Sequence, residues 1–438
     1  MPNASLHLPP TPTPGRKSSN TRHRPRNNCR SYARQSVDWY DVHGLATVAT
    51  MKCDTCSLAN TRWLVRAIVV ACCMMPSLAT SMEHVRLRRD GREQVIHGRV
   101  IVEAQDGGLL VLDQAHVLWT VMPDELIDRQ QDAAPFESLD HKVLSSELLK
   151  QLPAGFKVHK TTHYLICYNT SQAYAKWCGS LLESLYKGFR NYWRKQQFEL
   201  TDPDWPLVAI VFDSRQAYSA FAKSELQATG SITGYYSLTT NRVSMYDLTG
   251  ADGRLFPQRN AQARIRQILS RPEAERTVAT IVHEATHQLA FNCGLHTRFA
   301  DIPLWVSEGL AIYFESPDLK NAAGWRSIGR INRVRNIEFR EYLRFRAPDS
   351  LETLLATDER FRDSSSASKA YAEAWALNFF LIRTRMKEYR QYLQTLSKKK
   401  AMIYDEPEER LSLFRKAFGE DLRAFDTEFL RYVIRLIN

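Results

Sequence analysis

The sequence predicts an α+β protein, with a mixed sheet in the first half of the chain and helices in the second. Between about residues 160 and 250, short β-type runs such as "HYLICYNT" (163–170) and "PLVAIVFD" (206–213) alternate with helical patterns. After about residue 260 the strand patterns stop, and apolar residues recur at helical spacing almost to the C-terminus. Strands first and helices later is the order typical of α+β architectures.

Length and charge limit the number of domains and the kinds of partner that we expect. The chain has 438 residues, 44% of them hydrophobic, which is enough for two or three domains with real cores. Its net charge is +11, but residues 1–81 alone hold 10 Lys or Arg against 3 Asp or Glu. The remainder is only mildly basic, so we expect no nucleic-acid partner.

The N-terminus has the composition of a leader. Residues 1–50 predict a disordered basic tail, and we expect that Met51 is the true start and that the tail reflects a mis-assigned gene start. Residues 51–81 predict a signal peptide, because basic residues precede a short apolar run at 67–79. That run is shorter than the ~20 residues a membrane span needs. The pattern indicates an exported bacterial protein, periplasmic, cell-surface or secreted; a lipid anchor at Cys72 and a single buried helix are the alternatives.

Few cysteines remain after this leader. Cys167, Cys178 and Cys293 are widely spaced, which predicts neither a disulfide framework nor a cysteine-rich metal cluster, and at most one bridge. Cys53 and Cys56 form a C-x-x-C pair that no strand–helix unit surrounds, so we interpret them as incidental residues of the leader.

The remaining elements follow in order. Residues 82–133 predict a small β-module of three or four strands, and the polar stretch 123–140 predicts a linker. The main domain is expected at 134–438, with an α/β part at 134–260 and a helical part at 261–438. The α/β part also holds predicted helices at 171–195 and 214–226 and a hairpin at 231–247. Further helices are predicted at 261–268, 271–293, 303–315, 350–356, 366–396 and 408–436.

The segment "IVHEATHQLA" (281–290) carries the candidate chemistry. Ser270 and Glu273 predict a capping box for its helix, and Gly294 predicts its end. His283 and His287 are four residues apart and therefore share one helix face, where two imidazoles can hold one metal ion.

Two carboxylates complete the predicted site. Glu284 lies about 100° round the helix from His283, beside the metal, as a base rather than a ligand. Glu308 lies in the apolar segment "DIPLWVSEGLAIYFES", where Asp301 and Pro303 predict the start of a helix. A metal partner explains a carboxylate in such surroundings, with a salt bridge at the helix end as the alternative.

These motifs resemble a known class of enzymes. An HExxH followed about twenty residues later by Glu is the gluzincin pattern of zinc metallopeptidases, and "LWVSEGLA" is similar to a segment of the membrane-alanyl-type aminopeptidases. The Asp that thermolysin-like enzymes carry four residues after that Glu is Ile312 here. The overall pattern, over roughly 160–385, resembles secreted bacterial gluzincin-like proteins of the peptidase-MA type.

The resemblance implies a zincin-like fold and one zinc ion held by His283, His287 and Glu308. It also implies hydrolysis of peptide bonds in a peptide or protein substrate, with Glu284 activating a zinc-bound water that attacks the scissile carbonyl. The aminopeptidases place an oxyanion-supporting Tyr some sixty residues after the ligand Glu, and Tyr371 stands 63 residues after Glu308.

Several alternatives stay open. Tyr371, Trp375 and Phe379 are spaced by four and could form a packing stripe, and Tyr236 and Tyr246 are other candidate oxyanion donors. No G-x-M-E-N segment precedes the motif, which favours an endopeptidase that binds an extended peptide along the hairpin 231–247. Two other functions are compatible with the motifs. One is a zinc-stabilised surface binding or scaffold protein, and the other is a hydrolase of non-protein amides such as cell-wall material.

Overall fold

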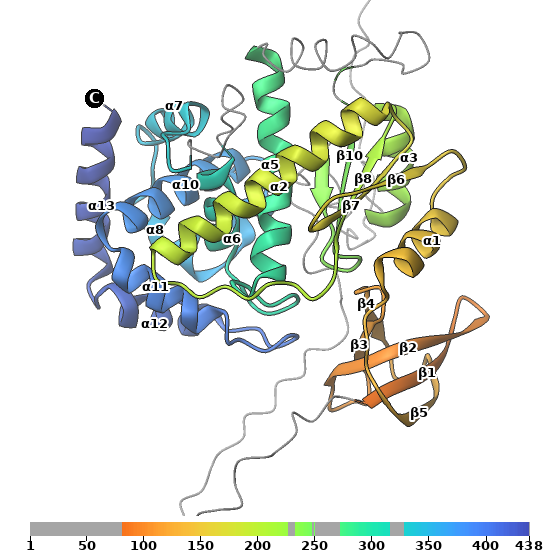
Figure 1. Cartoon of the computed structure of the whole chain (residues 1–438). Coiled ribbons are helices and arrows are strands. Elements are labelled where there is room, and N and C mark those ends of the chain that lie inside the picture. Colours follow the sequence, from red (N-terminus) through yellow and green to blue (C-terminus); the bar gives the residue numbers. More distant parts are fainter. Residues whose placement is uncertain (1–80, 227–232, 248, 250–271, 316–327, 438) are drawn as a thin grey trace, which may run out of the picture. The chain divides into compact units, whose positions relative to one another are not determined.

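The strand-forming half of the chain builds two separate five-stranded sheets (Figure 1). The computed structural model describes residues 81–226, 233–247, 249, 272–315 and 328–437, all within one compact unit. The predicted tail, the signal peptide up to residue 80, Cys72 and the predicted helix at 261–268 lie outside the described residues.

The first sheet is antiparallel, with strand order β4-β3-β2-β1-β5. Its strands are β1 (Ser81–Arg89), β2 (Arg92–Glu103), β3 (Leu109–Asp113), β4 (Leu118–Val121) and β5 (Leu126–Pro135). Alternate residues such as Val85, Ile96 and Val111 turn inward and form a small core of their own.

The prediction of a linker at 123–140 was wrong, because β5 occupies its middle and pairs with β1. Every β5 residue is exposed or partly exposed. An edge strand that buries no side chain shows no apolar alternation, so the sequence pattern did not reveal it.

The second sheet has strand order β6-β7-β8-β10-β9, with β7, β8 and β10 parallel and the two edge strands antiparallel. Its strands are β6 (Lys157–Lys160), β7 (Tyr164–Tyr168), β8 (Leu207–Phe212), β9 (Gly234–Tyr236) and β10 (Arg242–Tyr246). The connecting helices are α1 (His141–Gln151), α2 (Gln172–Lys195) and α3 (Arg215–Leu226). This is the mixed sheet that the sequence predicts, with the predicted hairpin formed by β9 and β10 at one edge.

Helices cover both faces of the second sheet. Ala209 and Val211 of β8 belong to the large core that also contains α2 and α5 (Pro272–Asn292). Val208 and Ile210 face the other way, into a core shared with α1 and α3. The alternation of side chains along β8 therefore divides the apolar interior into two layers.

The second half of the described chain is helical, as predicted. Its helices after α5 are α6 (Leu304–Phe314), α7 (Arg333–Tyr342), α8 (Ser350–Ala356), α9 (Glu359–Arg362), α10 (Ala367–Thr384), α11 (Met386–Leu396), α12 (Pro407–Phe418) and α13 (Leu422–Ile437). The helices predicted at 366–396 and 408–436 are each two helices, divided at Arg385 and at Gly419, whose φ is +119°. A glycine adopts this φ without strain, and a helix cannot continue through it.

Helix α6 begins at Leu304 with Pro303 at its N-cap position, close to the prediction, but Asp301 has a different role. The side chain of Asp358 accepts a hydrogen bond from the backbone N–H of Leu304 and so satisfies the first turn of the helix. Asp301 instead forms a buried ion pair with Arg410 and contacts Lys399. Asp301 therefore attaches α12 to the start of α6 rather than capping α6 itself.

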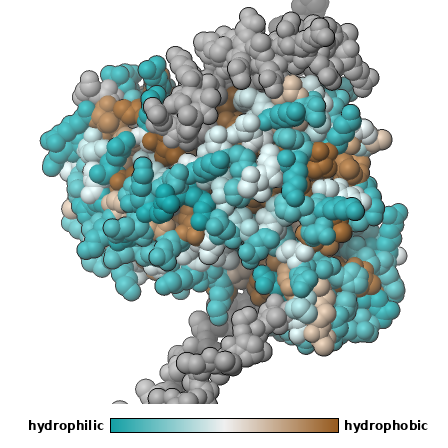
Figure 2. Space-filling model, in the orientation of Figure 1, coloured by the Kyte–Doolittle hydropathy of each residue, from teal (hydrophilic) through white to brown (hydrophobic). Residues whose placement is uncertain are grey.

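Figure 2 shows that polar residues cover most of the face in view, and that apolar residues gather only in small separate patches. Among the described residues, no helix combines the length and the apolar character that crossing a membrane requires.

The three described cysteines Cys167, Cys178 and Cys293 are all buried and unpaired.

Candidate metal centre

Helix α5 is fixed against the sheet along one side. Its residues Val282, Ala285 and Leu289 are fully buried. The Gln288 side chain donates hydrogen bonds of 3.0 Å each to the backbone oxygens of Val208 and Asn241, one from β8 and one from the turn before β10. These contacts set the height and rotation of the helix that carries His283 and His287.

Of the residues predicted to cap the two ends of α5, only Gly294 is fully described. Ser270 lies outside the described residues, and the side chain of Glu273 is not described either, so the capping box stays a prediction. Gly294 has a φ of +81° and lies two residues after Asn292, the last residue of α5, which confirms it as the stop after the helix.

His283, His287 and Glu308 converge on one point, and one ligand atom from each lies within 4.8 Å of the others. The two Nε2 atoms of the histidines are 3.2 Å apart. The Glu308 carboxylate oxygens lie 3.1 Å from His283 Nε2 and 3.5 Å from His287 Nε2. The side chain of Glu308 is 2% exposed, and that of His287 is 5% exposed.

These separations suit a metal ion. Donor atoms ~2.0–2.1 Å from a tetrahedral zinc ion lie about 3.3 Å from one another. The three distances scatter around that value without any rearrangement of the side chains. Two imidazole nitrogens and one carboxylate oxygen are also a donor set that zinc accepts, so the residues present fit one such ion.

A second carboxylate holds the first histidine in orientation. Glu315 Oε2 lies 3.0 Å from Nδ1 of His283, and Glu315 Oε1 accepts a hydrogen bond of 2.6 Å from the Asn332 side-chain amide. Asn332 Oδ1 in turn accepts from the backbone N–H of Arg335 at the start of α7. Because a carboxylate only accepts hydrogen bonds, Nδ1 of His283 carries a proton towards Glu315, and Nε2 is the nitrogen that a metal ion would take in place of its proton.

Glu315 was not among the predicted site residues. One signal was available: Glu315 follows Glu308 by seven residues, so two turns of helix bring both side chains to the same face. The partner Asn332 lies 17 residues further on, and no periodic pattern connects it to the motif.

The charged groups of this cluster shift one another's pKa values. Burial alone would lower the pKa of His283, but its hydrogen bonds to Glu308 and Glu315 and the Glu308 charge raise it to about 10. Burial acts to raise the pKa of Glu308, but His287 and His283 outweigh it and hold that pKa well below its usual range. The carboxylate of Glu308 therefore stays ionised, as a metal ligand must.

Glu284 lies beside the three residues but makes a different contact. Its Oε2 accepts a hydrogen bond of 2.8 Å from the backbone N–H of Tyr236 in β9. Burial raises the pKa of Glu284 above its usual value, and His283 and His287 oppose that shift. A Cβ on Gly234 would lie 3.9 Å from the Glu284 Cγ, so β9 runs close to this carboxylate.

The candidate tyrosines lie in different surroundings. The Tyr371 ring on α10 contacts the Phe361 ring edge-on and has the Arg335 guanidinium over its face. The Tyr236 hydroxyl donates to Asn241 Oδ1, whereas the ring of Tyr246 lies against that of Tyr218. Tyr371 is therefore connected through Arg335 to the start of α7, the same turn that supports Glu315.

Comparison with known proteins gives a match to a family model. A family model described as "Protein of unknown function (DUF1570)" matches residues 277–402. The matched segment contains His283, Glu284, His287, Glu308 and Tyr371, together with Glu315 and Asn332. No curated protein matches the chain.

Proposed function

We propose that this protein is an exported zinc metallopeptidase that hydrolyses peptide bonds within a peptide or protein substrate. The observation that carries the proposal is the convergence of His283, His287 and Glu308 next to Glu284, a carboxylate outside the ligand set. Structural zinc sites usually fill all four positions with protein ligands, whereas catalytic sites use three and keep one open. Export rests on the pattern of residues 51–81 alone.

The chain supplies the groups that such a reaction needs. A zinc ion bound to the three ligands would polarise the substrate carbonyl and lower the pKa of a water molecule towards neutrality. Glu284 would take the proton of the attacking water on Oε1, because its Oε2 faces the backbone of Tyr236, and would then pass it to the leaving amine. Tyr371 would donate a hydrogen bond to the oxyanion.

Strand β9 is the part of the fold that suits an extended substrate. It is an edge strand of the second sheet, and the N–H of Tyr236 points away from β10 towards Glu284. A peptide that pairs with the outer edge of β9 would run past the base and the metal ligands. This placement favours an endopeptidase, because strand pairing does not require a free chain end.

Two substitutions separate the base from the ligands. Glu284→Gln is expected to reduce cleavage about 10²–10⁴-fold, the contribution of a general base, while zinc stays bound. Glu308→Ala is expected to remove the zinc as well. Zinc would be measured by elemental analysis, and cleavage with a mixed peptide library in the presence and absence of a chelator. Glu352→Gln, an exposed carboxylate of α8, is the control and should change neither measurement.

The outcomes distinguish the candidate functions. A wild-type protein without stoichiometric zinc would refute the metal centre, and undiminished zinc in Glu308→Ala would refute the third ligand. Stoichiometric zinc with no cleavage of any peptide would instead favour the scaffold alternative or a non-protein amide as substrate.

A further inference from the structure

A second group of histidines lies on the first sheet, among residues that the proposed hydrolysis does not use. His84 of β1 stands directly opposite His97 of β2 in the antiparallel register. Their neighbours Val85 and Ile96 turn into the small core of this sheet. Because successive side chains alternate between the faces of a strand, His84 and His97 both lie on the outer face.

The two imidazole rings meet nitrogen to nitrogen. The Nδ1 atoms of His84 and His97 are 2.6 Å apart, and the rings meet edge to face with centroids 4.9 Å apart. Two bare lone pairs, or two N–H groups, would repel each other at this separation, so one nitrogen donates to the other. The pair thus directs at least one lone pair into the space between the rings.

Asp132 on β5 determines which of the two Nδ1 atoms carries this lone pair. Its Oδ2 lies 2.9 Å from Nε2 of His84, and its Oδ1 accepts a hydrogen bond of 2.7 Å from the backbone N–H of Ala134. The carboxylate only accepts, so His84 carries its proton on Nε2 and leaves Nδ1 bare. A carboxylate behind a histidine is the arrangement that orients histidine ligands in metal sites.

We propose that His84 and His97 bind a divalent transition-metal ion, Zn²⁺, Ni²⁺ or Cu²⁺, through their Nδ1 atoms, with Asp132 as the positioning residue. The ion would take the place of the proton that lies between the two Nδ1 atoms. That proton belongs to His97 and would move to Nε2 of the same ring, so the charge of His97 would not change. Neutral imidazole is a common ligand of all three ions. Water would complete the coordination, which makes this an exchangeable site that is independent of the buried centre.

The geometry needs only a small adjustment. Two nitrogens on one tetrahedral ion lie about 3.3 Å apart, so the 2.6 Å separation must widen by roughly 0.7 Å. The Nε2 atoms of the buried pair are already 3.2 Å apart. His97 is exposed and His84 partly exposed, so rotation of the rings meets little resistance. The nearest basic side chain of β1 on this face, Arg86, is paired with Asp128 and its charge is thereby compensated.

Metal stoichiometry tests the proposal directly. The full chain, His97→Gln, His287→Ala and the double variant would be dialysed against Zn²⁺, and in parallel against Ni²⁺, and analysed for bound metal. We expect His97→Gln to lower the count by one ion per chain in both the wild-type and the His287→Ala backgrounds. An unchanged count in both backgrounds overturns the proposal. Because His287→Ala disables the buried centre, failure of the proposed peptidase site leaves this comparison intact.

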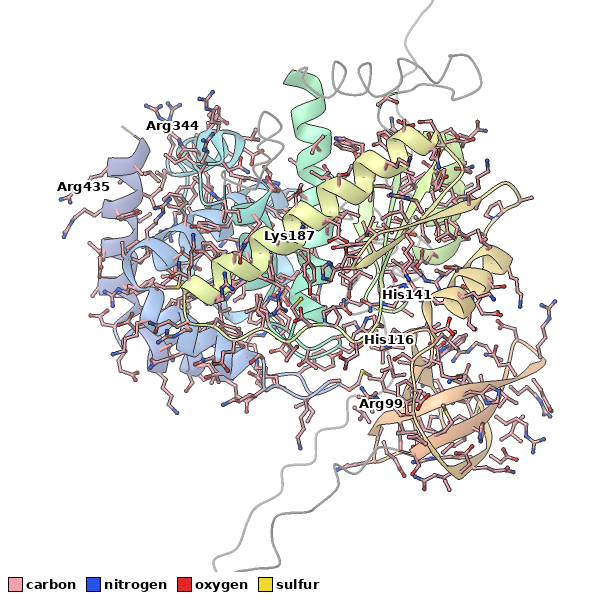
Figure 3. All side chains as sticks on the ribbon, viewed as in Figure 1. Arg99, His116, His141, Lys187, Arg344 and Arg435 are labelled. Carbon is pink, nitrogen blue, oxygen red and sulfur yellow. The ribbon has the colours of Figure 1, made fainter. Side chains whose placement is uncertain are left out.

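Two further variants test the role of Asp132. Asp132→Asn keeps both ligands and is expected to weaken binding at this site about 10–100-fold, with the thermal melting of the metal-free protein unchanged. His141→Gln removes a histidine at the start of α1 (Figure 3) and should alter neither count nor affinity. Wild-type affinity in Asp132→Asn would overturn the positioning role, and a lower count in His141→Gln would overturn the assignment to the pair.

Discussion

Replacing Glu315 by glutamine tests the hydrogen-bonded chain that orients His283. The substitution keeps the size of the side chain and removes its charge. In the structure, one Glu315 oxygen accepts from the Asn332 amide and the other faces Nδ1 of His283. Glutamine replaces one of these two acceptors with an NH₂ donor, so one of the two contacts must fail.

The surrounding bonds prevent an easy repair. Asn332 cannot turn its amide round without losing the bond from the Arg335 backbone that begins α7. If the new NH₂ faces His283, that ring must change tautomer and place its proton on Nε2, the nitrogen that would bind the proposed metal ion.

Two estimates of the effect agree. Loss of a hydrogen bond to a charged group costs about 1.5–3 kcal/mol. Loss of a carboxylate behind a histidine ligand weakens metal affinity about 10–100-fold, or roughly 1.4–2.8 kcal/mol. We therefore expect Glu315→Gln to bind zinc about 10–100-fold more weakly than the wild type.

Competition with a fluorescent zinc chelator would measure this affinity, and thermal melting of the metal-free protein would check the fold. Glu338→Gln is the matched control, because Glu338 pairs with Arg335 on α7 and does not contact His283. An affinity within twofold of the wild type for Glu315→Gln would refute the reasoning. An equal loss in Glu338→Gln would show that the effect belongs to α7 as a whole.

Three further predictions address the surroundings of the centre. Gly309→Ala would overlap the Asn378 amide where α6 meets α10, so we expect a loss of about 1–3 kcal/mol in urea unfolding, and wild-type stability would contradict this close packing. Burial pushes the pKa of Asp301 up, but Arg410 and Lys399 outweigh it and lower that pKa. The stability that this ion pair contributes is thus present above the ordinary pKa of an aspartate and is lost as pH falls through the lowered value. Asp301→Asn should therefore cost about 3 kcal/mol in the free energy of unfolding at pH 7, and the variant should lose less stability in acid than the wild type does. Tyr371→Phe should slow peptide cleavage about 10²–10³-fold with zinc still bound, and an unchanged rate would exclude the oxyanion role.

The proximity of His283, His287 and Glu308 could be predicted from the sequence. His283 and His287 share one face of α5, and α6 brings Glu308 to them, because the spacing within a helix fixes which side chains are neighbours. The strands β7 and β8 were predicted from continuous apolar runs, which a sheet buried on both faces requires, and β9 and β10 were predicted as a hairpin.

The parts that were not predicted depend on contacts between distant segments. The role of Glu315 depends on Asn332 at the start of another helix, and β5 is held by its backbone pairing with β1 and by ion pairs such as Asp128–Arg86. Asp301 lies just before a helix start, as a capping residue would, but its partner Arg410 lies 109 residues away. Local periodicity contains no information on such partners, which only the assembled tertiary structure specifies.

The placement of the ligands has a consequence for the order of folding. His283 and Glu308 are 25 residues apart, whereas the Asp301–Arg410 pair closes a segment of 109 residues. Closing a short loop costs less conformational entropy, so an ion can join α5 to α6 before the distant helices arrive. We expect zinc, when present at the start of refolding, to act as a nucleation point and to speed recovery of the native chain, and to have a smaller effect when it is added late.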